Sequence, residues 1–436
     1  MTPENHLRAS LALGVAATVI ALVGVITGVS DSSGRQILAG PPPPPPIPPA
    51  VVTVSAGTTN IPVVASAPET TPGNAGTPGT PPAAPAAPRP AATPSAPINP
   101  TTPVSVAVTQ GTLRSVVLTD AKSGKQVPGT PGPDGHSWQS SARLAYGGTY
   151  KLVATAVGED EKPAVSTATV TTIAPAKLDF ASFIPAPSSG SVGVGQPLVV
   201  RFNHAVTDKA AAERALKVTS VPAQPGDWFW MSSTEAHYRP ATYWAPGTTI
   251  TLAADMFGVD LGNKTFGESD RSETIHIHDS WIAKADGSSE EMQIFHNGAL
   301  VKTMPISLGS AKNPSHNGPH VISDKQPSII MDSCTYGVCE GQKGYYKEKV
   351  DLDERISADG EFVHSAPWSV GQQGSDNVSH GCINLSPANA QWFFNTFGVG
   401  DVVEITHSGG PMLPVWDTYG DWVLSWAQWQ AGGASG

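Results

Sequence analysis

Cysteine is scarce in this chain of 436 residues: there are three, and none lies before residue 334. No two of them form a C-x-x-C pair, so a thiolate zinc site is not expected, and we predict neither a metal nor a cofactor. Charged residues make up only 14%, and 25 basic against 36 acidic residues give a net charge of −11. Since no basic patch stands out, nucleic acid is not expected as a partner.

Glycine and proline are instead abundant, with 44 and 42 residues. With the length of the chain, this composition indicates several domains joined by loops and a linker. Residues 41–102 form a tract of Pro, Ala, Thr and Gly with almost no charge. We expect this tract to be a disordered Pro-rich linker, because such a segment cannot bury a core. A proline-rich ligand for a binding module is the alternative.

A long apolar run lies near the N-terminus, where Leu11 to Val29 carries no charge and follows Arg8. As a helix this run rises about 28 Å, close to the roughly 30 Å of bilayer hydrocarbon. We therefore expect residues 1–40 to hold a transmembrane anchor over residues 11–29. Such an anchor in the cytoplasmic membrane would leave the rest of the chain outside the cytoplasm, in the cell envelope. A cleaved signal peptide is the alternative.

Two modules of short strands are predicted after the linker. Residues 103–176 show alternating runs such as Val104–Val108 between glycine-rich turns, and residues 177–275 continue in the same way. Regular short strands with turn signals are typical of small β-sandwiches. In the second module we expect Asp208 to cap a short helix that ends near Leu216. Its clustered tryptophans are expected in the core or at a sheet edge.

A third domain is expected over residues 276–407. Its early part alternates around Asn297-Gly298, a strong short hairpin signal. Ser386 with a following proline predicts the start of a helix, and Gly398 predicts its end. A closing strand is expected over residues 402–406.

The tail, residues 408–436, holds four of the eleven tryptophans. Trp422, Trp426 and Trp429 recur at helical spacing, which predicts one helix that docks all three rings on a neighbouring domain. Binding to a membrane surface is the alternative, but no Lys or Arg lies nearby to support it.

Reactive side chains cluster between His364 and Asn384, which reads HSAPWSVGQQGSDNVSHGCIN. Cys382 is the candidate nucleophile, because a thiol attacks a carbonyl well only as thiolate and needs a base or a positive environment. His364 and His380 can supply either. Gly381 has no Cβ, so backbone N–H groups beside it can face a developing oxyanion. A buried structural cysteine beside loop histidines is the plain alternative.

This stretch, with a histidine eighteen positions before the cysteine, resembles the signature of L,D-transpeptidases with the YkuD fold. The mycobacterial type is the closer match, through residues 331–333, 335–338, 362–369 and 378–389. The resemblance implies a mainly β protein. Residues 103–176 and 177–275 would be immunoglobulin-like spacers, followed by a β-rich catalytic domain.

The resemblance also implies the reaction, a peptidoglycan cross-link between the third residues of two stem peptides. Cys382 would attack one stem peptide, release its terminal D-alanine and form a thioester, which an amine of the second stem then takes. His364 would be the base, oriented by Ser365. Backbone at His380, Gly381 and Cys382 would form the oxyanion pocket.

Other positions of the family pattern imply substrate contacts. Tyr346 would offer its hydroxyl to the oxyanion pocket, and Ser379 and Asn384 would hold the loop. Met331, Tyr336 and Trp368 would line the pocket, partly through a lid over residues 331–349. Carbapenem β-lactams are implied as inhibitors that acylate the same cysteine.

Two other classes of function stay open. In an L,D-carboxypeptidase or cysteine peptidase, water would replace the acceptor amine, and the same residues would serve it. A catalytically idle wall-binding or spacer protein is the other class, but the intact set of cysteine and histidines argues against it.

Cys334 and Cys339 lie five positions apart inside the predicted lid. Because an exported protein meets an oxidising environment, we predict that they form a disulfide and leave Cys382 free. The family carries Ser and Pro at these positions, so the chain departs from the pattern. Two free thiols in a mobile loop are the alternative. His316 and His320 flank a turn that lies near the active site in the family, and they are assigned no role.

Overall fold

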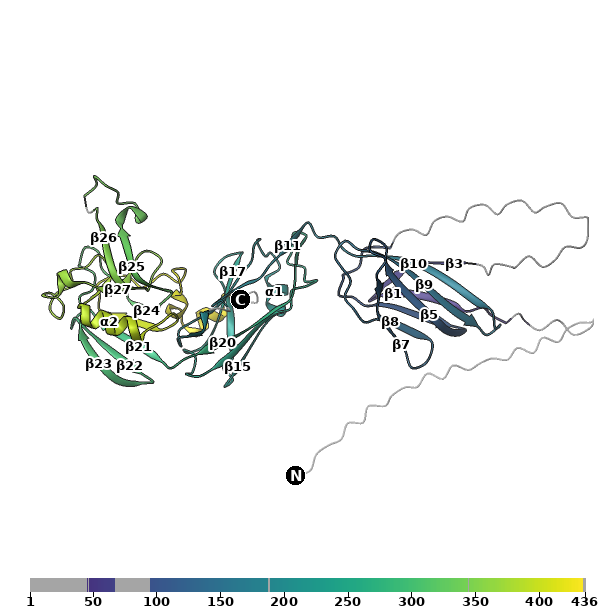
Figure 1. Cartoon of the computed structure of the whole chain (residues 1–436), viewed down its shortest axis with the longest axis horizontal. Coiled ribbons are helices and arrows are strands. Elements are labelled where there is room, and N and C mark those ends of the chain that lie inside the picture. The colour runs from purple at the N-terminus through teal and green to yellow at the C-terminus, as the bar shows by residue number, and fades with distance from the viewer. Residues whose placement is uncertain (1–44, 46, 67–94, 187–188, 344, 434–436) are drawn as a thin grey trace, which may run out of the picture. The chain divides into compact units, whose positions relative to one another are not determined.

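The structure is a computed structural model that describes residues 45, 47–66, 95–186, 189–343 and 345–433 (Figure 1). This part of the chain is mainly β, with two β-sandwich modules and a β-rich domain that carries the cysteine–histidine stretch. The predicted anchor at residues 11–29 lies outside the described residues. Among the helices that are described, none is both long and apolar enough to cross a membrane.

The first module is a sandwich of two five-stranded sheets around a core that includes Val106, Leu118 and Leu152. One sheet has the order β2-β1-β4-β8-β7, formed by β1 Val51–Ala56, β2 Thr59–Ile61, β4 Val104–Thr109, β7 Gly129–Pro131 and β8 Ser137–Ser140. The other has the order β3-β10-β9-β5-β6, formed by β3 Val63–Ser66, β5 Gly111–Asp120, β6 Gln126–Val127, β9 Thr149–Gly158 and β10 Pro163–Thr171.

The first three strands correct the predicted linker. The expectation of disorder over residues 41–102 is wrong for residues 51–66, where β1 pairs along its whole length with β4 and β3 pairs with β10. Val52, Val54 and Ala56 alternate and are buried, so the period-two signal of a half-buried strand is present there. The proline-rich composition on both sides obscured it. Residues 67–94 of the same tract lie outside the described residues.

The second module is a sandwich of two four-stranded sheets with an added parallel pair, β11 Lys177–Asp179 and β19 Thr265–Gly267. The order β12-β14-β17-β16 joins β12 Ser182–Ile184, β14 Leu198–Arg201, β16 Gly226–Trp230 and β17 Glu235–Pro240. The order β13-β20-β18-β15 joins β13 Ser191–Val192, β15 Leu216–Val221, β18 Thr249–Ala254 and β20 Arg271–Ile277.

Two expectations for this module are confirmed. The Asp208 side chain accepts a hydrogen bond from the N–H of Ala211 at 2.8 Å and caps helix α1, Lys209–Ala215. Trp228, Trp230 and Trp244 are buried in the core, as expected for structural aromatics.

The third domain packs two sheets and one helix around a shared core (Figure 1). The order β23-β22-β21-β29-β24 joins β21 Trp281–Asp286, β22 Glu291–His296, β23 Ala299–Pro305, β24 Gly318–Val321 and β29 Val402–Thr406. The order β25-β26-β27-β28 joins β25 Asp324–Asp332, β26 Lys347–Arg355, β27 Phe362–Ser365 and β28 Ile383–Leu385. Helix α2, Pro387–Thr396, and two 3-10 turns, η2 Ser333–Tyr336 and η3 Pro367–Ser369, complete the domain.

The local signals in this domain are confirmed. Asn297 and Gly298 have φ of 48° and 82°, which a primed two-residue hairpin turn requires, and they connect β22 to β23. Ser386 caps α2 by accepting from the N–H of Asn389 at 3.4 Å. Inside the domain, Phe393 of this helix is fully buried in the core behind β27 and β28.

The tail corrects the prediction of one tryptophan helix. Trp422 lies in η4, Gly420–Val423, whereas Trp426 and Trp429 lie in α3, Trp426–Gln430. Leu424 is extended and Ser425 caps α3, so the two segments are separate. The spacing of the tryptophans continues across the break and so did not reveal it. Ser425 is a preferred N-cap residue and was the local signal that a second helix starts there.

The three rings nevertheless meet at one residue of the second module. The buried guanidinium of Arg239 lies 4.7 Å from the ring centroid of Trp422, 5.7 Å from that of Trp426 and 4.5 Å from that of Trp429. Its Nη2 donates to the carbonyl oxygen of Leu424 at 2.8 Å. The tail therefore docks on the second module, as predicted, and does so by cation–π contacts.

Candidate active site

A cavity of about 300 Å³ gathers most of the side chains singled out in the sequence. It is lined by Met331, Tyr346, His364, Trp368, Ser379, His380, Cys382 and Asn384, and also by Glu348, Val350 and Val378. The parallel pairing of β27 with β28 sets Val363 opposite Ile383. This register brings His364 and Cys382, eighteen positions apart in sequence, to neighbouring places at one end of the sheet.

The Cys382 thiol is buried and is not part of a disulfide. Burial raises the pKa of this thiol to about 12, so it is uncharged at neutral pH. Its Sγ–H donates to the carbonyl oxygen of Gly360 over 3.7 Å. Within the described part of the chain no hydrogen bond joins the thiol to His364, so the thiol rests turned toward Gly360.

The His364 ring is buried and lines the same cavity as the thiol. Burial lowers the pKa of this imidazole to about 4, so the ring is neutral at pH 7. Nδ1 lies 3.0 Å from the backbone carbonyl oxygen of Ser365. A carbonyl can only accept, so Nδ1 carries the proton and Nε2 keeps its lone pair. The backbone carbonyl, not the hydroxyl, is the group of Ser365 that orients the ring.

The loop that carries the cysteine is held by its own serine. Ser379 Oγ donates to the carbonyl oxygen of Cys382 at 2.7 Å and accepts from the N–H of Gly381 at 3.1 Å. This second bond occupies one of the three amides expected to form an oxyanion pocket. Among the described residues, the amides of His380 and Cys382 donate no hydrogen bond.

Asn384 supports the other side of the cavity. Its Nδ2 donates to Ser369 Oγ at 3.0 Å, and its backbone N–H donates to the carbonyl oxygen of Ser307 at 2.9 Å. Both groups are thereby engaged within the protein, which agrees with a role in holding the loop. The indole of Trp368, 56% exposed, lies 6.0 Å from the His364 ring centroid and forms part of the rim.

The strands β25 and β26 extend away from the rest of the domain and end in the segment predicted as a lid (Figure 1). A disulfide joins Cys334 to Cys339 in this segment. Ser333 ties its base, since its N–H donates to the carbonyl oxygen of Tyr346 at 3.0 Å and its Oγ accepts from the Tyr346 N–H at 2.9 Å. The Tyr346 ring lies 5.2 Å from the His380 ring centroid. The side chain of Tyr336 lies outside the description.

A second cavity of about 290 Å³ adjoins the first and shares Met331 and Tyr346 with it. Its further lining includes Arg355, Asp359 and Gly360. The Cys382 thiol, which lines the first cavity, donates to the carbonyl oxygen of Gly360, a residue that lines the second.

Sequence reasoning missed three residues that line the thiol cavity: Glu348, Val350 and Val378. The first two follow Tyr346 at positions i+2 and i+4 on β26, so they point to the same face of the strand. Once Tyr346 is assigned to the pocket, strand periodicity alone could have found them. Val378 carries no such signal, since it lies in a loop.

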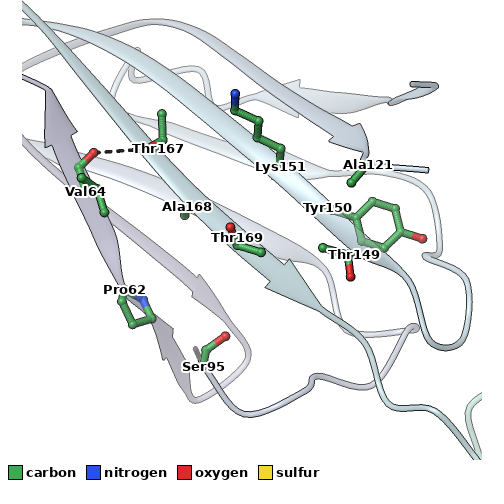
Figure 2. Close-up of a pocket in the computed structure, with 10 residues that line it drawn as sticks. All are labelled: Pro62, Val64, Ser95, Ala121, Thr149, Tyr150, Lys151, Thr167, Ala168 and Thr169. Atoms are coloured by element: carbon green, nitrogen blue, oxygen red, sulfur yellow. Dashed lines mark hydrogen bonds between the residues drawn. The ribbon is translucent and has the colours of Figure 1, made fainter. Parts of the chain in front are cut away.

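The sandwich modules offer a contrasting cavity. A cavity of about 250 Å³ opens on the first module between β3, β9 and β10, and it is shown in Figure 2. Its polar side chains are hydroxyls and one lysine, Lys151, and Thr167 donates to the carbonyl oxygen of Val64 at 3.5 Å. Without a thiol, imidazole or carboxylate, this space lacks the groups for acyl transfer. In the described residues, no group of three or more His, Cys, Asp or Glu could hold a metal ion.

Comparison with known proteins finds two families that match parts of this chain. Residues 95–260 match the family of bacterial Ig domains, and residues 280–405 match the L,D-transpeptidase catalytic domain. L,D-transpeptidase 2 of Mycobacterium tuberculosis (strain CDC 1551 / Oshkosh) is 41% identical over 331 residues, 76% of this chain and 80% of the relative. L,D-transpeptidase 5 of Mycobacterium tuberculosis (strain ATCC 25618 / H37Rv) is 33% identical over 333 residues, 75% of this chain and 72% of the relative.

A solved structure of LD transpeptidase LdtMt1 in complex with imipenem is 34% identical, covers 53% of this chain and 100% of that chain, and has a TM-score of 0.47. The relatives of M. tuberculosis match over most of their own length as well as over most of this chain. With a matching catalytic domain and a thiol and imidazole in one cavity, this chain belongs to the L,D-transpeptidase family and is an enzyme of the YkuD type.

Proposed function

We propose that this enzyme cross-links peptidoglycan stem peptides through a thioester on Cys382. His364 accepts the thiol proton at Nε2 as the sulfur attacks the carbonyl of the third stem residue. The amides of His380 and Cys382, with the Tyr346 hydroxyl, receive the developing oxyanion. As the bond to the terminal D-alanine breaks, His364 gives this proton to the departing nitrogen, so that D-alanine leaves as the free amino acid and the imidazole is neutral again. An amine of a second stem then attacks the thioester and releases the thiol.

The observation that carries this proposal is the pair of neutral groups in one cavity. A thiol whose pKa is raised to about 12 forms little thiolate on its own, and a histidine whose pKa is lowered to about 4 holds no proton at neutral pH. These states favour proton transfer during attack over a preformed ion pair. They also require the thiol to turn from the Gly360 carbonyl toward His364 when substrate binds.

The two adjoining cavities favour transfer over hydrolysis. A transferase must hold two stems at once, and the cavity of about 300 Å³ that Cys382 lines adjoins a second cavity of about 290 Å³. An acceptor stem that fills the second space would exclude water from the thioester and favour aminolysis. A carboxypeptidase needs only one of the spaces.

The test is incubation of the purified protein with a disaccharide-tetrapeptide, followed by product masses. A cross-linked dimer with loss of D-alanine supports transfer, whereas a trimmed tripeptide alone supports hydrolysis. Cys382→Ala, which removes one sulfur, should abolish the dimer. The same variant should no longer gain the mass of imipenem, the probe chosen because it is the ligand of the solved relative. A folded Cys382→Ala protein that still gains this mass would refute the nucleophile.

We also propose that residues 11–29 anchor the chain in the cytoplasmic membrane, with the catalytic domain outside the cytoplasm. The uncharged run is long enough to span a bilayer. The described strands that begin at β1 leave a spacer between the anchor and the first module. Protease added to intact spheroplasts should release a fragment that contains the three folded domains. Complete protection of that fragment would rule out this topology.

A further inference from the structure

A buried carboxylate lies directly beneath the loop that carries Cys382. Glu361 is 5% exposed, and a Cβ added at Gly381 would meet its Cγ at 3.4 Å. Gly381 has a φ of 127°, which a side chain would strain, so the loop approaches Glu361 through glycine. Glu361 lies in the connection between β26 and β27, immediately before Phe362, and takes no part in the mechanism proposed above.

The partners of this carboxylate are two histidines. Oε1 of Glu361 accepts from the backbone N–H of His316 at 2.9 Å and from its Nδ1–H at 3.1 Å. Oε2 of Glu361 lies 3.3 Å from Nε2 of His320, which is fully buried. Glu361, His316 and His320 therefore form one cluster, which we call the carboxylate cluster.

His320 is the most deeply buried member of this cluster. Nδ1 of His320 lies 3.0 Å from the carbonyl oxygen of Gly318, which can only accept, so Nδ1 donates to it. Nε2 of His320 faces Oε2 of Glu361, and neither buried atom has another hydrogen-bond partner among the described residues.

The cluster also fixes the position of the Gly381 peptide. Next to His316, the hydroxyl of Ser315 accepts from the N–H of Gly309 at 3.0 Å and donates to the carbonyl oxygen of Gly381 at 2.6 Å. Glu361 holds His316, and the neighbouring Ser315 holds Gly381. Because Ser315 and His316 are neighbours in the chain, these hydrogen bonds tie the cluster to Gly381, the residue that precedes Cys382.

The charges act on the thiol as well. Burial raises the pKa of the Glu361 carboxyl, but hydrogen bonds from His316 and His320 outweigh burial and bring its pKa below the usual range. The resulting negative charge raises the pKa of the Cys382 thiol, in addition to the larger effect of burial. A hydrogen bond with Glu361 in turn raises the pKa of His316.

Further charged groups face this region from the surrounding segments. Asp353 raises and Arg355 lowers the pKa of the thiol, whereas Asp359 and Asp417 face His316 and raise its pKa. All four residues are unchanged in the variants described below, so any change in the reactivity of the thiol comes from the substituted member of the carboxylate cluster.

We propose that Glu361, His316 and His320 are positioning residues that hold Gly381, and that Glu361 couples the protonation of His316 to the ionisation of Cys382. A protonated His316 offsets the carboxylate and eases formation of the thiolate, whereas a neutral His316 uncovers its charge and opposes it. The proposal rests on the proposed role of Cys382, because only for a nucleophile does this coupling govern the rate of acylation.

The coupling can be measured on the thiol itself, without any substrate. Cys334 and Cys339 are joined, so Cys382 is the free thiol of the described chain that 4,4′-dithiodipyridine can modify. The rate of this reaction is measured from pH 5.5 to 9.5 for the parent, Glu361→Gln and His316→Gln. The glutamine at 361 keeps an acceptor for His316 and removes only the charge.

The two variants should change the rate in opposite directions. Glu361→Gln should react about 3- to 10-fold faster than the parent at pH 9, with a smaller ratio at pH 6, where protonated His316 already offsets the carboxylate. His316→Gln should react slower by a similar factor at pH 6 and approach the parent at pH 9. Ratios that stay constant with pH indicate a structural role only and overturn the proposal.

Two controls keep the test decisive. Asp286 forms another carboxylate–histidine pair in the same domain, with its Oδ1 3.1 Å from Nδ1 of His407. Asp286→Asn removes this carboxylate and should leave the modification rate of Cys382 unchanged. If Glu361→Gln does not fold, the pH dependence of the modification rate of His316→Gln tests the proposal by itself, because His316 is only half-buried. Failure of Cys382 as nucleophile would appear in the Cys382→Ala acylation assay, whereas this measurement reports only the thiol and its neighbours.

Discussion

Nδ1 of His364 donates its proton to the carbonyl oxygen of Ser365 over 3.0 Å, which leaves Nε2 as the ring atom that can accept one. The ring is buried, and its pKa is lowered to about 4. A lowered pKa means that the ring becomes protonated only as the pH falls toward 4. The base is therefore available throughout the range in which an ordinary histidine would titrate.

The first prediction follows from the lowered pKa of His364. The rate of acylation by imipenem should not decrease as the pH is lowered from 7.5 to 5.5, because His364 stays unprotonated over this range. Stopped-flow fluorescence or mass spectrometry at fixed times can follow the reaction. A rate that falls about tenfold per pH unit would instead indicate attack by a preformed thiolate, and would contradict proton transfer to a neutral imidazole.

The second prediction separates the two histidines. His364→Asn should lower imipenem acylation by about 10²- to 10⁴-fold, the usual cost of removing a general base, and leave substrate binding near normal. His380→Asn is the matched control, because His380 lines the same cavity but is exposed. Its effect should be clearly smaller. If His380→Asn is the more damaging change at equal thermal stability, the two roles are reversed.

The third prediction concerns the disulfide of the lid. Thiol counting on the unfolded, unreduced protein should give one thiol, and counting after reduction should give three. So short a loop restricts the unfolded chain by only roughly 2 kcal/mol, so mild reduction should not unfold the domain. It should loosen the segment from η2 to β26 and change the rate of acylation.

A double variant provides the control for that experiment. Cys334→Ser with Cys339→Ser should acylate at the rate of the reduced parent and should not respond to reductant. Three thiols in the unreduced parent would refute the disulfide, and a response to reductant in the double variant would place the effect elsewhere.

The fourth prediction concerns His237 of the second module, which contacts the docked tail through Asp421. His237 is buried between Glu235, 2.9 Å from its Nε2, and Asp421, 2.8 Å from its Nδ1. Burial lowers the pKa of His237, but the two carboxylates outweigh burial and raise it to about 9. A raised folded-state pKa stabilises the protein fully below the unfolded value of about 6.5, and this contribution is lost as the pH rises through 9.

Raising the pKa of His237 from 6.5 to about 9 contributes about 3 kcal/mol to stability. Thermal unfolding followed by tryptophan fluorescence should therefore show a lower midpoint at pH 9.5 than at pH 6.5. His237→Gln should lower the midpoint at pH 6.5 and remove most of this pH dependence. His276→Gln, an exposed histidine of the same module, is the control. Equal pH dependence in the parent and His237→Gln would contradict the prediction.

Short-range signals in the sequence predicted much of the fold. The Asn297-Gly298 turn, the Asp208 cap and the Ser386-Pro387 helix start depend on neighbours in sequence, and the structure has each of them. The strands at residues 51–66 were missed, because their pairing with β4 and β10 joins parts of the chain that composition separates.

The site divides in the same way. A dense motif of cysteine and histidines points to the cavity, whereas the carboxylate cluster joins residues 316, 320 and 361 through tertiary contacts alone. The engagement of the Gly381 amide by Ser379 depends on the path of one loop, and no spacing predicts it.

The three tryptophans around Arg239 also set an order of events during synthesis. Arg239 belongs to β17, yet the rings that cover its guanidinium come from η4 and α3, which follow the catalytic domain in sequence. Every strand of the second module emerges from the ribosome before the catalytic domain, but the guanidinium stays uncovered until Trp429 has been made. The second module therefore reaches its final packing only after the catalytic domain has been synthesised, and a chain that stops before Trp422 leaves a buried cation without its cover.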